Sequence, residues 1–122
     1  EDNNVYHDEW MAGRVGGGQE LVRVGESTFT RVYAGGTISV AAMEQLGITK
    51  KAVMEFLIRL LNQAGEATRL YENYGPVQDG EWTYQYQVLE QNPAIPMTTG
   101  KEDISYKGQV VFTHVFVMCP VE

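Results

Sequence analysis

The sequence predicts a single α+β domain in which a strongly curved antiparallel sheet of about six strands packs on one long helix. Three observations predict this fold. Strand-like runs occur at 19–24, 28–33, 68–74, 82–90, 103–106 and 109–120. Apolar residues recur over about 50–64 at the spacing of one helical face. Short turns join successive strands, so the strands should pair antiparallel and curl around the helix that covers one face.

The chain is long enough for one domain. It has 122 residues, of which 43% are hydrophobic, and this suffices for one core. We expect residues 1–18 to form a flexible N-terminal segment, because Gly13, Gly16, Gly17 and Gly18 interrupt any regular pattern there. Residues 19–122 then form the α+β domain.

Two helices are expected after the first pair of strands. Ser39 is a suitable N-cap for a short helix at about 40–46, and Gly47 can end it. Thr49 is a suitable cap for the long helix. The apolar stripe of this helix consists of Val53, Phe56, Leu57, Leu60, Leu61 and Ala64.

The remaining strands are expected to form hairpins. The last strand, 109–120, is β-branched and aromatic on both alternating faces, which is typical of a strand covered on both sides. Asp79-Gly80 and Lys107-Gly108 are turn signals, and 92–100 holds two prolines and should be a loop. A curled sheet around one helix leaves a concave mouth, where small ligands usually bind.

Charge disfavours nucleic acid as a partner. The formal net charge is −7, and an acidic surface repels a phosphate backbone. Residues 42–53 have the spacing of a helix-turn-helix, but the second helix is too apolar to read a DNA groove. A simple corner between two helices explains the same residues.

Cysteine usage and hydropathy indicate the compartment. Cys119 is the single cysteine, so no internal disulfide can form, and a reducing, cytoplasmic location is expected. The chain begins with Glu1 rather than Met, which is also compatible with a cleaved signal peptide. No window approaches the length of a membrane span, so no membrane partner is expected. A homodimer is compatible with the composition.

His114 is the candidate catalytic residue. It lies among Phe112, Phe116 and other apolar neighbours in the last strand. Its predicted role is that of a general acid or base, or of a hydrogen-bond donor to a ligand carbonyl. The alternative is a neutral core histidine. Counting outward from the Lys107-Gly108 turn places Glu102 and Asp103 near residues 112 and 113, so neither need share a face with His114.

Aromatic residues on neighbouring strands are candidates for the ligand pocket. They form a row at Trp82, Tyr84 and Tyr86, which could instead be core packing. The other candidate lining residues are Tyr33, Phe112, Phe116 and Arg31. Arg31 beside aromatics suggests an anion clamp, or else a solvent-facing strand edge.

No cofactor or metal is expected. His7 and His114 have no ligand-spaced partner. The glycines at 13–18 do not form a phosphate loop, because no strand is expected before them and no helix follows. Cys119 has no neighbouring cation, so we expect it to be an inert, small hydrophobic residue.

Two functions fit these features. The first is a small-molecule-binding domain, and within it an isomerase or cyclase that acts by positioning and proton transfer on an apolar, oxygen-bearing ligand. The alternative is an acidic protein-binding module of the inhibitor or immunity type, without catalytic activity. The alternative predicts a filled core and acidic residues clustered on one surface.

The C-terminal half also resembles an uncharacterised bacterial family, the domain of unknown function 5680. The matching residues lie within 76–116: Asp79, Gly80, Trp82, Tyr84, Gly100, Glu102, Ile104, Tyr106, Gly108 and Val111. Tyr33-Ala34-Gly35-Gly36 is similar to a Gly-Gly turn in the earlier half of that family. The resemblance implies a curled antiparallel sheet around a helix and carries over no functional residue.

Overall fold

The computed structural model describes residues 5–64 and 71–122. In chain order, its elements are β1 (Val5–Ala12), β2 (Val15–Val24), β3 (Ser27–Thr37), α1 (Val40–Leu46), α2 (Lys50–Ala64), β4 (Tyr74–Asp79), β5 (Trp82–Gln91), β6 (Thr98–Tyr106) and β7 (Gln109–Pro120). In the described part of the chain, no helix is both long and apolar enough to cross a membrane.

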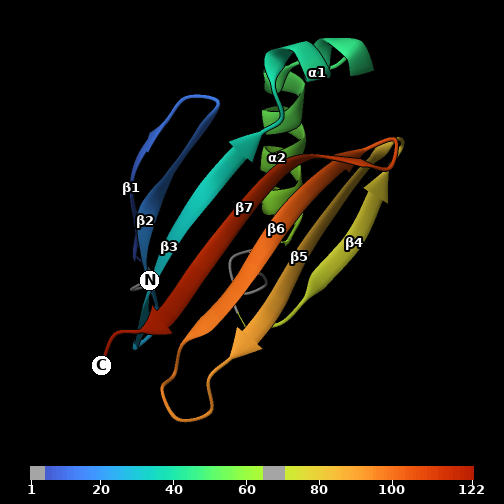
Figure 1. Ribbon diagram of the computed structural model, residues 1–122. Helices are drawn as coiled ribbons and strands as arrows, with labels where there is room; N and C mark the ends of the chain where they lie inside the picture. The colour runs from blue at the N-terminus through green and yellow to red at the C-terminus, as the bar shows by residue number, and fades with distance from the viewer. Residues whose placement is uncertain (1–4, 65–70) are drawn as a thin grey trace.

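The strands form one antiparallel sheet with the order β1-β2-β3-β7-β6-β5-β4. Hairpins join β1, β2 and β3 on one side and β4, β5, β6 and β7 on the other. The two sets meet where β3 pairs with β7, so the C-terminal strand lies in the middle of the sheet. Both helices lie on the same face of this sheet (Figure 1). We call that face the inner face.

The predicted fold class is wrong. The structure is mostly a seven-stranded antiparallel sheet with two short helices, not six strands packed on one long helix. The additional strand, β1, lies in the segment predicted to be flexible, and β2 begins at Val15 rather than Gln19. Residues 1–4 of that predicted segment lie outside the described residues.

Of the glycines that suggested an irregular N-terminus, Gly16, Gly17 and Gly18 belong to β2, where neighbouring strands approach closely, and Gly13 lies between β1 and β2. A Cβ at Gly18 would lie 2.6 Å from the Cβ of Trp10 and 2.8 Å from the Tyr33 hydroxyl. A Cβ at Gly17 would overlap the carbonyl oxygen of Tyr33. Glycine is therefore required here by packing in an extended strand, not by a turn.

Other predicted boundaries also differ from the structure, and β3 continues to Thr37, beyond the predicted strand 28–33. β4 begins at Tyr74, so 71–73 of the predicted strand 68–74 are not strand, and 68–70 lie outside the described residues. β6 begins at Thr98, within the predicted loop 92–100. Gly100 lies within that strand. The position requires glycine because a Cβ there would overlap the ring of Phe116 on β7.

The helices occupy the predicted ranges and have the predicted N-caps. Ser39 Oγ accepts a hydrogen bond from Ala42 N at 3.1 Å, and Thr49 Oγ1 accepts one from Ala52 N at 3.1 Å. Gly47 ends α1 in the left-handed conformation, with φ of 75°. On the inner face, the core contains Val53, Phe56 and Leu60 of α2 with Tyr84, Tyr86, Ile104, Phe112, Phe116 and Met118 of the sheet.

Candidate functional site

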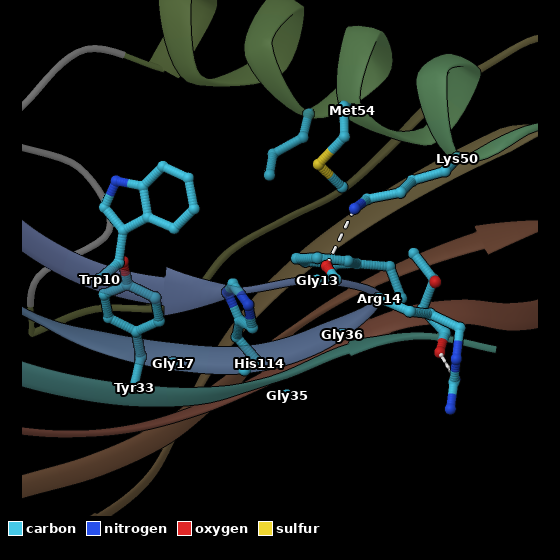
Figure 2. A pocket seen from close by; sticks show the side chains of 14 residues that line it. Trp10, Gly13, Arg14, Gly17, Tyr33, Gly35, Gly36, Lys50, Met54 and His114 are labelled. Carbon is cyan, nitrogen blue, oxygen red and sulfur yellow. Dashed lines mark hydrogen bonds between the residues drawn. The ribbon is translucent and has the colours of Figure 1, made fainter. Parts of the chain in front are cut away.

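A cavity of about 360 Å³ lies between α2 and the strands β1, β2, β3 and β7. We call it the helix–hairpin cavity. Its lining residues are Trp10, Gly13, Arg14, Gly16, Gly17, Tyr33, Gly35, Gly36, Thr37, Lys50, Met54, Leu57, Phe112 and His114. Figure 2 shows Met54 and Lys50 descending from α2 on one side, with Tyr33 and His114 on the strands opposite.

The cavity exists because glycines replace side chains on part of the inner face. Gly16 of β2 pairs with Gly35 of β3, and Gly35 pairs with His114 of β7. No side chain therefore fills the space above these backbone positions, and the imidazole of His114 borders it. A Cβ at Gly35 would overlap the carbonyl oxygen of Thr113, so this position is closed to larger residues.

The imidazole of His114 lies between two aromatic rings. Its centroid is 4.5 Å from that of Phe112 and 5.0 Å from that of Tyr33. The residue is half-buried, and it lines both the helix–hairpin cavity and a second, smaller one. His114 is therefore neither sealed in the core nor turned to bulk water.

A β-bulge brings Glu102 opposite His114, against the register predicted from the turn. The β6–β7 register shifts at Ile104 and Ser105, so that Ile104 pairs with Phe112 and Glu102 pairs with His114. Cβ atoms of directly opposed residues lie about 5 Å apart on the same face of an antiparallel sheet. Counting from the turn does not reveal this pairing, because a bulge adds one residue on β7. Glu102 and His114 thus lie opposite each other on the same face of the sheet.

The second cavity, of about 190 Å³, is lined by Tyr6, Asp8, Glu20, Arg31, Tyr33, Leu57, Leu61, Glu102, His114 and Phe116. We call it the carboxylate cavity. Tyrosine hydroxyls donate to each of its acids. Tyr6 bonds Glu20 Oε2 at 2.6 Å, Tyr33 bonds Asp8 Oδ1 at 3.0 Å, and Tyr84 bonds Glu102.

Arg31 lies at the base of the carboxylate cavity with its charge partly balanced. Its Nη1 is 3.3 Å from Glu20 Oε1, and its Nη2 donates to the Tyr86 hydroxyl at 3.3 Å. The guanidinium carbon lies 5.1 Å from the centre of the Phe116 ring, a favourable cation–π arrangement. These contacts indicate that the main role of Arg31 is to pair with Glu20 inside the protein.

The tyrosines of this cavity are hydrogen-bond donors. Burial, and then the hydrogen bond to Asp8, raise the pKa of Tyr33 above its ordinary value. Burial and the hydrogen bond to Glu20 raise the pKa of Tyr6 in the same way. Both hydroxyls therefore keep their protons at neutral pH and cannot act as bases there.

The structure gathers most of the predicted site residues around these two cavities. His114 and Tyr33 line both, Phe112 lines the first, and Arg31 and Phe116 line the second. The aromatic row of β5 lines neither cavity. Tyr84 and Tyr86 are fully buried in the core, and Trp82 packs against Phe56, with ring centroids 5.4 Å apart.

Sequence reasoning missed several lining residues, namely Trp10, Arg14, Thr37, Lys50, Met54 and Leu57. Trp10 could have been found from the alternation of Tyr6, Asp8 and Trp10 along the first strand. Lys50 begins α2, and its position over the cavity depends on how the helix crosses the sheet, which no local pattern encodes.

Another hollow in the described chain is lined by fewer titratable side chains. It has a volume of about 490 Å³ and lies along residues 91–98 with Tyr71 and Pro120, and Tyr71 is its only titratable lining residue among those described. Within residues 5–64 and 71–122, no three His, Cys, Asp or Glu side chains are arranged to hold a metal ion. The two cavities at His114 are therefore the candidate site.

Comparison of the chain with protein-family models, with curated proteins and with solved structures gives no match, so the resemblance to the domain of unknown function 5680 stays a prediction.

Proposed function

We propose that this protein binds a small, largely apolar, oxygen-bearing molecule in the helix–hairpin cavity. The observation that carries the proposal is a cavity of about 360 Å³ that borders the imidazole of His114. This volume lies within the range of small-ligand sites. Trp10, Met54, Leu57 and Phe112 supply apolar lining. The alternative, a protein-binding module with a filled core, is less well supported because an open cavity lies beside the core at this point.

His114 is the group that could exchange a proton with a bound molecule, as an isomerase or cyclase requires. Its ring faces the cavity between Tyr33 and Phe112, and Glu102 stands opposite on β6. A carboxylate beside an imidazole can orient the ring and stabilise its protonated form. Tyr33, which keeps its proton, is a fixed neighbour of this pair.

The binding proposal is tested by filling the cavity from α2. The neutral dye N-phenyl-1-naphthylamine becomes fluorescent in apolar sites, so its titration reports occupancy. Leu57→Trp places an indole where both cavities meet α2, and we expect it to weaken dye binding at least about tenfold, because filling the space removes the contacts that bind an apolar ligand. Ile58→Trp is the matched control, since Ile58 is 58% exposed and belongs to neither lining.

The two histidines provide a second readout of the same experiment. Carbon–proton NMR signals of the His114 ring should shift on addition of the dye, whereas those of His7, whose side chain is 60% exposed on β1, should stay unchanged. Equal dye affinity in the Leu57→Trp and Ile58→Trp variants, or a shift at His7 alone, would contradict binding at this cavity.

A further inference from the structure

The helix–hairpin cavity differs in charge from the rest of the molecule. Asp and Glu account for 16 residues of the sequence, and the formal net charge is −7. Nevertheless, no acidic side chain lines this cavity, and its charged lining residues, among those described, are Arg14 and Lys50. A site with this lining attracts an anion that the surrounding acidic surface would repel.

Lys50 places its ammonium at the cavity from the first turn of α2. Its Nζ donates to the carbonyl oxygen of Gly13 at 2.9 Å, across the space between the helix and the β1–β2 turn (Figure 2). An ammonium has three N–H donors. One is used on Gly13, and two can therefore meet a ligand oxygen.

Thr37 supplies an independent observation at the same end. It lines the cavity and is only 5% exposed, and its Oγ1 has no hydrogen-bond partner among the described residues. Buried hydroxyls are nearly always hydrogen-bonded. The guanidinium of Arg14 lies beside it, because Arg14 Nη1 donates to the Thr37 carbonyl oxygen at 2.6 Å. Thr37 thus adds a donor, unsatisfied within the described chain, to the end of the cavity where the two cations lie.

The Trp10 ring and the two basic side chains lie at opposite sides of the cavity (Figure 2). In Figure 2, Trp10 is at one side of the cavity and Arg14 at the other, with Met54 and Lys50 above. An amphipathic ligand could therefore place its apolar body by Trp10 and its charge by Arg14 and Lys50.

We propose that the ligand of the helix–hairpin cavity carries a single carboxylate on an apolar body, and that Lys50 selects for this charge. The inference rests on the proposed function, because it names the ligand class of the same cavity. The carboxylate accepts hydrogen bonds from Lys50 Nζ and Thr37 Oγ1, with Arg14 beside them, and charge-assisted bonds of this kind are stronger than neutral ones.

The test compares an anionic competitor with a neutral one. 2-Naphthoate and 2-naphthamide share a ring system and nearly the same shape, and each is titrated against bound N-phenyl-1-naphthylamine. With the native protein, we expect naphthoate to displace the dye at a concentration at least about fivefold lower than naphthamide, as a partly exposed charge-assisted bond predicts. Lys50→Met should bring this ratio close to one, whereas Lys50→Arg should preserve most of it.

Lys51→Met is the matched control, because it removes the same charge from the next residue of α2, whose side chain is 85% exposed and pairs with Glu55. It should keep the native preference. An unchanged ratio in Lys50→Met, or equal displacement by both competitors in the native protein, overturns the inference. Dye binding that persists in each variant shows that the cavity is intact. If the affinity for the dye is unchanged in Leu57→Trp, the proposed function fails, and this inference fails with it.

Discussion

At the scale of single residues, the hydroxyl of Thr37 is the clearest sign of a site adapted to something other than stability. A valine at this position would have nearly the same shape and no polar atom to satisfy. Instead, Oγ1 is buried on the wall of the helix–hairpin cavity without a partner among the described residues. An unsatisfied buried hydroxyl costs about 1–3 kcal/mol, so the free protein is less stable than it could be.

Thr37→Val should therefore change stability and affinity in opposite directions. We expect the free energy of unfolding to rise by about 1 kcal/mol, measured by urea denaturation, because a buried polar atom is removed. The advantage of naphthoate over naphthamide should fall at the same time, because the carboxylate loses a donor. A variant that is less stable than the native protein would show that the hydroxyl has a structural partner instead.

At the scale of the elements, Gly35 sets how closely β3 approaches β7 beside His114. Its φ of +150° and the overlap of a Cβ with the Thr113 carbonyl oxygen make any other residue unfavourable. We expect Gly35→Ala to lower the free energy of unfolding by about 1–3 kcal/mol, measured by urea denaturation, because the neighbouring backbone must move.

Gly13→Ala is the control for this change, because a Cβ at Gly13 meets nothing within 4 Å. It should alter stability by no more than about 0.5 kcal/mol. Similar losses in the two variants would contradict the close approach of β3 and β7.

The elements also show which parts of the structure local patterns can predict. Caps and periodicity located both helices, because Ser39, Thr49 and Gly47 act on neighbouring backbone. β1 and the start of β2 were missed, because Gly17 and Gly18 are fixed by Tyr33 and Trp10 from other strands. Non-local packing, rather than local preference, decides such positions.

The candidate site follows the same division between local and non-local causes. His114 could be selected from its place in the last strand, but its neighbour Glu102 depends on the bulge opposite Ile104 and Ser105. The extra residue in that bulge is Val111, which is buried and whose carbonyl oxygen accepts a hydrogen bond from Ile38 N at 3.0 Å. Counting from a turn cannot reveal a contact of this kind.

At the scale of the whole molecule, the inner face joins charged and tyrosine side chains from both ends of the chain. Tyr6 and Asp8 come from β1 and Tyr33 from β3, while Glu102 belongs to β6. The donors in these pairs are neutral phenols, so the network depends on their protonation. Stability should therefore respond to alkaline pH through the whole fold and not at one site alone.

The sign of this response follows from the raised pKa values of Tyr6 and Tyr33. In the unfolded chain a tyrosine loses its proton near pH 10, so above about pH 10 the unfolded state binds fewer protons than the native state. The contribution of these pairs is thus fully present below about pH 10 and is lost as pH rises toward the native pKa values.

Urea denaturation at about pH 8 and about pH 11 measures this loss. The double variant Tyr6→Phe, Tyr33→Phe should be less stable at the lower pH, because Glu20 and Asp8 lose donors, and should lose less stability between the two. Parallel losses in the native protein and the variant would contradict the assignment of these tyrosines.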